Sequence, residues 1–216
     1  MKFSQFAFAL LAFTTAPSAF AGILTLEDSA SKVNGVTISK GGKLKVESRN
    51  EISLITVAAG QRSKLGGLVN IYVGELLVAD KNKFACRGNA LDSLKDQAAV
   101  AVRLNMQYSI TESDLEAAFT GGFENNNVDE TPAIKEFVNA VKTGGKPVAG
   151  SKIAFSGEKL ADGSEIVTYE NAAGKATSIK GSSGFIKAVF SLWLGNPGSE
   201  KGLKNLRDNF VNCEVK

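Results

Sequence analysis

The segment from residue 184 to residue 197 constrains the fold more than any other part of the chain. Its sequence is GFIKAVFSLWLGNP, and its apolar side chains recur at helical spacing over one wide face. We expect a helix that is capped at its start by Ser182 or Ser183 and that ends at Gly195. Because this face is wide and carries the only tryptophan of the chain, Trp193, we expect it to pack the helix onto a sheet.

The first 21 residues have the pattern of a secretory signal peptide. Lys2 precedes an uncharged apolar run at residues 6–13, and residues 19–21 (Ala-Phe-Ala) form a small-x-small cleavage site. A membrane anchor is the alternative, but the apolar run is short for crossing a bilayer. We therefore expect a mature chain of residues 22–216 that forms a single domain, has no membrane span and is secreted into a bacterial periplasm.

The composition excludes several classes of function. The chain contains no histidine, which removes Ser-His-Asp triads, Cys-His pairs and histidine-based zinc sites. Its net charge is only +3, and its lysines and arginines form no stripe interleaved with aromatic residues, so nucleic acid is not an expected partner. We assign no cofactor, no metal site and no catalytic residue.

The chain has two cysteines, Cys86 and Cys213. In a secreted protein, such a pair suggests one disulfide. Cys86 follows a run typical of a strand and Cys213 lies in the C-terminal tail, so a bridge would tie the tail to the sheet. The alternative is two unpaired thiols.

The first half of the chain has the alternation of apolar and polar residues that is typical of strands. Residues 33–39 and 43–47 alternate on either side of Gly41-Gly42, which predicts a hairpin that turns at these glycines. The runs at 52–58 and 68–78 are richer in β-branched residues and suit central strands.

Helical signals follow. A short helix is expected from Asn89, before a strand at 100–108. Thr111 and Asp114 have capping-box spacing for a helix that ends before Gly121-Gly122. Thr131-Pro132 opens another helix, which ends at Gly144-Gly145.

Strands return at 152–156, 165–169 and 177–180, and Ser199 is expected to cap a last helix that carries Leu203, Leu206 and Phe210. The strand runs and helix runs do not follow a β-α-β alternation. This order predicts an α+β fold around an antiparallel sheet.

Four segments have the order and spacing of a known family. They are GQRSK at 60–64 leading to VNIYVG at 69–74, VRLNM at 102–106 leading to a helix, the hairpin at 152–169 followed by GKA, and residues 185–197, which are the most specific. Together they resemble the chalcone isomerase-like family over roughly residues 33–210. The resemblance implies an open-faced sandwich, in which a large antiparallel sheet has helices layered on one face.

The plant enzymes of this family hold a chalcone in a near-attack shape for ring closure. An arginine binds a phenolate-like oxygen, a threonine and a tyrosine organise a water near the ketone, and an asparagine helps to bind the other ring. Arg62 matches the arginine, whereas the other three positions fall near Val73, Leu115 and Gly122. The resemblance thus implies that the polar set for catalysis is reduced to the arginine.

Non-catalytic members of the fold resemble fatty-acid binders, in which the same arginine and a tyrosine hold a carboxylate inside an apolar cleft. By this resemblance, the ligand-binding residues are Arg62, Tyr72, Tyr108 and Leu115. The remaining apolar wall would come from Leu104, Met106, Phe119 and Phe190.

Each candidate also has an ordinary structural explanation. Arg62 can be a solvated loop charge, and Tyr72 and Tyr108 can be core or edge residues with satisfied hydroxyl groups. Arg103 is expected on the wet face of the sheet. If helices cover that face instead, Arg103 becomes a second candidate for binding an acidic ligand.

Three functions remain open from the sequence. We expect a periplasmic binding protein for an apolar or fatty-acid-like small molecule, without catalysis. One alternative is an isomerase or lyase that acts on a chalcone-like conjugated carbonyl. The other is an envelope interaction protein that binds no ligand and fills its cleft with its own side chains.

Overall fold

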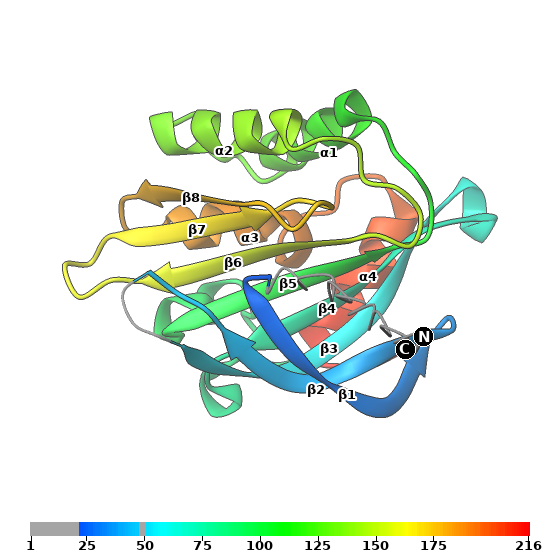
Figure 1. Cartoon of the computed structure of the whole chain (residues 1–216), viewed down its shortest axis with the longest axis horizontal. Coiled ribbons are helices and arrows are strands. Elements are labelled where there is room, and N and C mark those ends of the chain that lie inside the picture. The colour runs from blue at the N-terminus through cyan, green and yellow to red at the C-terminus, as the bar shows by residue number, and fades with distance from the viewer. Residues whose placement is uncertain (1–21, 48–50) are drawn as a thin grey trace, which may run out of the picture.

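The computed structural model describes residues 22–47 and 51–216, in which eight strands form one antiparallel sheet (Figure 1). The order of the strands in the sheet is their order along the chain. The predicted α+β class is confirmed. The strands are β1 (Leu24–Val33), β2 (Val36–Leu44), β3 (Ile52–Lys64), β4 (Val69–Val78), β5 (Ala99–Met106), β6 (Lys152–Lys159), β7 (Glu165–Glu170) and β8 (Ala176–Gly181).

The first hairpin turns at a different place from the one predicted. The turn between β1 and β2 is Asn34-Gly35, where both residues have positive φ angles, as tight two-residue hairpin turns require. Gly41 and Gly42 lie inside β2 instead. A Cβ atom at Gly42 would overlap the carbonyl oxygen of Thr25, so these glycines permit a close approach of strands and do not form the turn.

The C-terminal tail lies beside β3, where β2 no longer pairs with it. The N–H of Ala59 donates to the carbonyl oxygen of Glu214 at 2.9 Å, and the N–H of Lys216 donates back to Ala59 at 3.1 Å. A disulfide joins Cys86 to Cys213, whose Cα atoms are 5.6 Å apart. The structure thus contains the bridge that the two cysteines suggested, and it ties the tail to the rest of the fold.

Four α-helices of the described chain lie over one face of the sheet, and none is long and apolar enough to span a membrane. The first two connect β5 to β6, and the last two follow β8 (Figure 1). They are α1 (Glu112–Asn125), α2 (Pro132–Thr143), α3 (Phe185–Leu194) and α4 (Lys201–Asn212).

The capping signals of the first two helices are confirmed. The Thr111 hydroxyl accepts a hydrogen bond of 3.1 Å from the N–H of Asp114 at the start of α1. The Thr131 hydroxyl accepts one of 3.3 Å from the N–H of Ile134 at the start of α2. These bonds satisfy backbone donors that have no partner inside their own helix.

The end of α1 and the segment before β5 differ from the prediction. Instead of ending before Gly121-Gly122, α1 continues to Asn125. A Cβ atom at Gly122 would overlap Leu192 of α3, so glycine here serves helix packing and not helix termination. The helix expected from Asn89 is only a short 3-10 helix at Asp92–Asp96.

The serines predicted to cap α3 and α4 do not do so. The N-cap of α3 is Gly184, which has a φ angle of 93°, and the N-cap of α4 is Glu200. Neither residue makes a side-chain hydrogen bond to its own helix. The N-terminus of α3 is instead capped by the carboxylate of Glu165 on β7. The Glu200 side chain forms an ion pair with Arg62.

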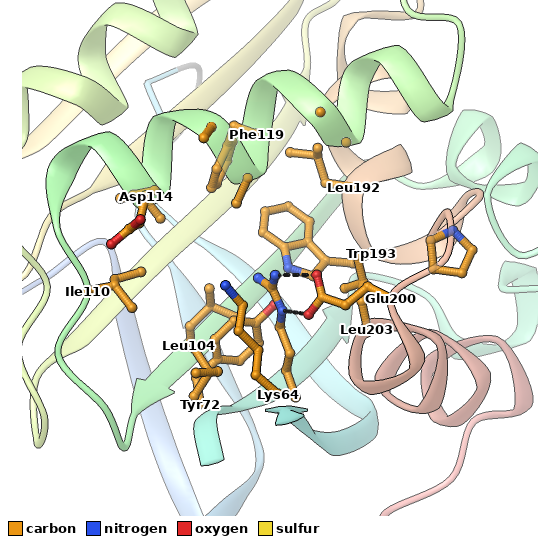
Figure 2. Close-up of a pocket in the computed structure, with 18 of the residues that line it drawn as sticks. Lys64, Tyr72, Leu104, Ile110, Asp114, Phe119, Leu192, Trp193, Glu200 and Leu203 are labelled. Carbon is orange, nitrogen blue, oxygen red and sulfur yellow. Dashed lines mark hydrogen bonds and ion pairs between the residues drawn. The ribbon is translucent and has the colours of Figure 1, made fainter. Parts of the chain in front are cut away.

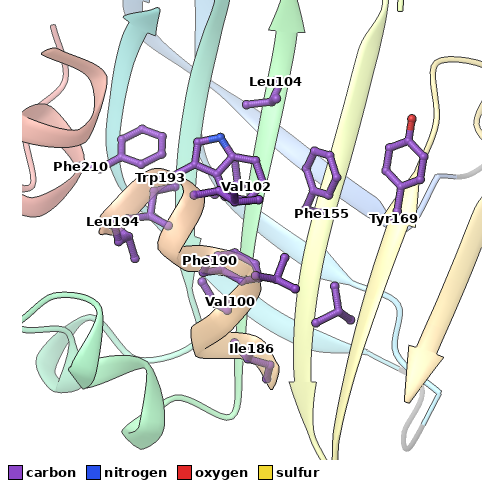
Figure 3. Close-up of a cluster of buried hydrophobic side chains, with 14 of the residues drawn as sticks. Val100, Val102, Leu104, Phe155, Tyr169, Ile186, Phe190, Trp193, Leu194 and Phe210 are labelled. Atoms are coloured by element: carbon purple, nitrogen blue, oxygen red, sulfur yellow. The ribbon is translucent and has the colours of Figure 1, made fainter. Parts of the chain in front are cut away.

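The predicted helix around Trp193 is confirmed as α3, and it packs in the main core. Figure 3 shows α3 lying over the strands that carry Val102 and Phe155. The Trp193 ring centroid is 5.0 Å from that of Phe155 and 5.9 Å from that of Phe190. These rings account for much of the contact between the helical layer and the sheet.

The other face of the sheet holds a buried ion pair. Glu75 is fully buried and accepts hydrogen bonds of 2.8 Å from the Nε of Arg103, the Nδ2 of Asn105 and the N–H of Ser39. Ser39 belongs to β2, so β2 contributes to covering this face. Arg103 is therefore bound to Glu75 and is not free to hold an acidic ligand.

Candidate ligand pocket

A cavity of about 310 Å³ lies between the sheet and the helical layer, beside Arg62. It is bounded by β3, β4 and β5 on one side, and by α1, the end of α3 and the start of α4 on the other (Figure 2). Its volume is at the lower end of the range of about 300–1,000 Å³ that is usual for small-molecule sites.

Arg62 is a strand residue and not a solvated loop charge. It lies near the end of β3, paired with Tyr72 of β4, and its side chain is only 12 % exposed. The guanidinium carbon lies 5.6 Å from the centroid of the Tyr72 ring, a distance at which the cation is attracted to the aromatic face. The two strands thus bring the two predicted polar residues together inside the cavity.

Arg62 already has an anionic partner. Its Nε donates to Glu200 Oε1 at 2.9 Å, and its second terminal nitrogen donates to Glu200 Oε2 at 2.7 Å. This parallel, two-bond arrangement is the strongest geometry of an arginine with a carboxylate. Dashed lines in Figure 2 mark both bonds to Glu200.

The surroundings of Arg62 keep it charged. Burial alone would lower the pKa of the guanidinium. The contacts with Tyr72 and Glu200 outweigh burial, so the net shift of the Arg62 pKa is upward. The pocket therefore contains a permanent cation whose charge is balanced by a side chain of the same protein.

The position of Glu200 follows from the close packing of α4 on β3. A Cβ atom at Gly202, in the first turn of α4, would overlap the carbonyl oxygen of Ser63 on β3. Because glycine allows the helix to start this near the strand, its N-cap residue lies within reach of Arg62. The Glu200 side chain is 34 % exposed, so it lies at the edge of the cavity and not in its depth.

Most of the cavity wall is apolar. Phe119 and Leu192 project from α1 and α3 toward the cavity, and Leu104 lies on the sheet side (Figure 2). The Trp193 ring also forms part of the wall. Further apolar side chains in the wall are those of Ile71, Met106, Ile110, Leu115, Ile153 and Leu203.

Of the four predicted ligand-binding residues, the structure brings three to the cavity. Arg62, Tyr72 and Leu115 line it, as do Leu104, Met106 and Phe119 of the predicted wall. Tyr108 lies after the end of β5 and is 53 % exposed, outside the cavity lining. Phe190 packs in the core beneath Trp193 and also lies outside the lining.

Sequence reasoning did not identify Glu200, although it is the direct partner of Arg62. The two residues are 138 positions apart, and Glu200 looks like an ordinary acidic residue near a helix start. The sequence favours a core position for Trp193, and the ring belongs both to the core and to the cavity wall. Nothing in the local sequence of either residue indicates a cavity.

Two further hollows on the described surface have linings without the polar residues that the sequence predicts to bind a ligand. One of about 330 Å³ lies near the start of α3, and one of about 520 Å³ lies along α1 and α2. The arginine and the two tyrosines that the sequence singled out line neither of them. In the described residues, no group of His, Cys, Asp or Glu side chains could hold a metal ion.

Comparison with a solved structure agrees with this fold. The crystal structure of a fatty-acid binding protein from Arabidopsis thaliana is similar to this chain, with a TM-score of 0.56 and 18 % sequence identity. The match covers 87 % of this chain and 98 % of the plant protein. At this level of identity, the similarity establishes the shared fold alone.

Comparison at the level of sequence families is more direct. No curated protein matches the chain at a significant level. The model of the family described as chalcone isomerase-like matches residues 30–206, which include all of β2 to β8 and α1 to α3. Since this match spans most of the sequence and the fold agrees with it, the chain belongs to the chalcone isomerase-like family.

Proposed function

We propose that this protein binds a small, largely apolar molecule in the cavity beside Arg62 and does not transform it. The observation that carries the proposal is the cavity itself, which combines a largely apolar wall with a small number of polar groups, among them the ion pair of Arg62 and Glu200. Small-molecule sites commonly have this composition, in which apolar walls supply affinity and a few polar groups orient the ligand. The fatty-acid binding protein with the same fold is consistent with such a role.

The size and lining of the cavity suit a chain of moderate length. Each methylene group that leaves water for such a wall contributes about 0.8 kcal/mol of transfer free energy. A ten-carbon chain can therefore supply useful affinity even after the loss of its translational and rotational freedom. Ten-carbon amphiphiles are for this reason suitable first probes.

The residues near which three of the family's catalytic positions fall support binding without chemistry. Leu115 and Gly122 line the cavity and offer no side-chain donor or acceptor. Val73 is fully buried in a separate cluster with Val33, Ile38 and Ala59, away from the cavity. Ring closure of a chalcone depends on holding and polarising the ketone, and Val73, Leu115 and Gly122 offer no side-chain group that could do so.

Trp193 provides a direct test. It is the only tryptophan of the chain, and its ring forms part of the cavity wall. Addition of 1-decanol should therefore change the tryptophan emission in a saturable manner and raise the melting temperature, since a ligand that binds only the folded state stabilises it. If neither signal changes with ten-carbon alcohols, esters or acids, the proposed function is wrong.

A pair of variants on α1 serves as the control. Ala118→Phe places a large ring in the cavity that Ala118 lines, and should abolish the response. Thr120→Phe makes a similar addition at an exposed position of the same helix that does not line this cavity, and should leave the response intact. Turnover of a conjugated enone by the unaltered protein would instead support the isomerase alternative.

We also propose that the protein acts in the bacterial periplasm as a mature chain that starts at Gly22. The charged start, apolar run and small-residue cleavage site of residues 1–21 support this proposal, although those residues lie outside the described part of the structure. Mass spectrometry of the protein released from the periplasm of an expressing bacterium should give an N-terminus at Gly22. An intact N-terminus in the cytoplasmic fraction would contradict it.

A further inference from the structure

The charges that line the cavity cancel one another. Besides Arg62 and Glu200, the charged residues of the lining are Lys64 and Asp114, so the wall has two cations and two anions. Arg62 is held by both oxygens of Glu200, and the Lys64 ammonium lowers the pKa of Asp114, though less than the hydrogen bonds from Thr111 do. The four charges of the lining sum to zero, and its shielded cation, Arg62, is already paired with a carboxylate.

This balance determines which ligand headgroup the cavity can accept. A carboxylate that entered beside Arg62, whose side chain is only 12 % exposed, would bring a third negative charge into the lining and close to Glu200. To make the two-bond contact itself, it would have to displace the Glu200 carboxylate from a geometry that is already complete. Both effects disfavour an anionic headgroup.

A neutral headgroup adds no negative charge near Glu200 and does not have to displace its carboxylate. The guanidinium group has five N–H donors, of which two are directed to Glu200 and one to the Tyr72 hydroxyl, so two remain for a ligand oxygen. The Glu200 oxygens have acceptor capacity left for a ligand hydroxyl. The ion pair thus presents a donor and an acceptor side by side without a net charge.

We infer that the cavity selects a neutral amphiphile, with an apolar chain and a hydroxyl, ester or ketone headgroup, over a fatty-acid anion, and that Glu200 is the residue that determines this selectivity. The inference rests on the proposed binding function and specifies the chemical class of its ligand. Glu200 then occupies the position at Arg62 that the carboxylate of a fatty acid would otherwise take.

The test compares ligands of one chain length at pH 8, where a carboxylic acid is ionised. Decanoate, 1-decanol and methyl decanoate are titrated into the full mature chain, with Trp193 emission and calorimetry as readouts. The unaltered protein should bind the alcohol and the ester at least about tenfold more tightly than decanoate, a ratio that corresponds to about 1.4 kcal/mol. This comparison needs no variant and does not depend on the folding of one.

Two variants then test whether Glu200 determines the selectivity between the alcohol and the carboxylate. Glu200→Gln removes the negative charge while it keeps an oxygen that can accept from Arg62, and it should tighten decanoate binding about tenfold and leave decanol within about threefold. Asp208→Asn removes the same charge from α4 at a position that does not line the cavity, and should change neither affinity.

The possible results distinguish this inference from the proposed function. If the unaltered protein binds decanoate as tightly as decanol, or if Glu200→Gln leaves the ratio of the two affinities unchanged, the selectivity of Glu200 is disproved while the binding function stands. If no ten-carbon ligand binds, the binding function itself is disproved. If a ligand carboxylate displaced Glu200 into solvent, decanoate would bind as tightly as decanol, and the selectivity would be disproved.

Discussion

The carboxylate of Glu165 on β7 accepts a hydrogen bond of 2.7 Å from the backbone N–H of Ile186, in the first turn of α3. Glu165 is only 4 % exposed, so this contact is shielded from water. The N-cap of α3, Gly184, offers no side chain, and the strand therefore supplies the cap that the helix lacks. A negative group at a helix N-terminus also interacts favourably with the helix dipole.

Replacement of this carboxylate should weaken the attachment of α3 to the sheet. We expect Glu165→Ala to lower the free energy of unfolding by about 1–3 kcal/mol, because it leaves a buried N–H without a partner. Glu165→Gln retains an acceptor oxygen and should lose less. Urea denaturation followed by Trp193 emission measures both, and an equal loss in the two variants would contradict the capping role.

The Glu75–Arg103 pair predicts a non-additive effect on stability. Arg103→Met leaves the fully buried Glu75 without its cationic partner, and should lower the free energy of unfolding by about 3–5 kcal/mol. The double variant Glu75→Gln with Arg103→Met has no charge left at this buried site and keeps an acceptor for the N–H of Ser39. Denaturant titration should therefore find the double variant more stable than Arg103→Met alone, and the reverse order would contradict the argument.

Tyr169 is the one buried side chain of the described residues whose polar atom has no hydrogen-bond partner. Its ring stacks on Phe155 with a centroid distance of 5.1 Å, so Tyr169→Phe preserves the packing and removes only the unsatisfied hydroxyl. We expect this variant to be more stable than the unaltered protein by about 1 kcal/mol in thermal or urea denaturation. Tyr108→Phe, at an exposed position, is the matched control and should change stability little.

The same hydroxyl predicts a loss of stability at alkaline pH. Burial raises the pKa of Tyr169 to about 12 in the folded protein. In the unfolded chain, the phenol ionises near its usual pKa of about 10. The unfolded state therefore releases its proton first, and the free energy of unfolding should fall as the pH rises from about 10 to about 12. Tyr169→Phe should show a shallower decrease over this interval, and identical slopes would contradict the assignment.

The disulfide should be a major source of stability. Cys86 and Cys213 are 127 residues apart, and the chain-entropy model gives about 4–5 kcal/mol for a loop of this length. The double variant Cys86→Ser with Cys213→Ser should lower the free energy of unfolding by about this amount. A reducing agent should lower the melting temperature of the unaltered protein and leave that of the double variant unchanged.

The parts of the fold that sequence reasoning predicted are those with strong local signals. Thr131-Pro132, the Thr111–Asp114 pair and the apolar face around Trp193 each determine a local conformation, and the structure contains all three helices. Two of the wrong predictions concern glycine pairs. Gly41-Gly42 and Gly121-Gly122 were interpreted as chain reversals or helix ends, whereas Gly42 and Gly122 allow two segments to approach closely. Such an approach depends on tertiary contacts, which a single sequence does not display.

The same distinction between local signals and tertiary contacts applies to the residues of the candidate site. Arg62 and Tyr72 could be found because both lie in a strand pattern that resembles the family, and their pairing across β3 and β4 brings them together. Glu200 could not be found, because its role depends on where α4 starts relative to β3, and that position is set by the contact of Gly202 with Ser63. The sequence thus indicates Arg62, which carries the positive charge of the site, but it does not indicate Glu200, which balances that charge.

The strand order of the sheet has a consequence for how the protein is assembled. Because each strand pairs with the one before it, the sheet can grow from one edge as the chain is synthesised. The cavity cannot form in the same gradual way, since Glu200 and Leu203 belong to the last part of the chain and meet residues of β3 and β4 that were made much earlier. We expect a chain that stops after β8 to have no binding site, so that ligand recognition begins only when synthesis is nearly complete.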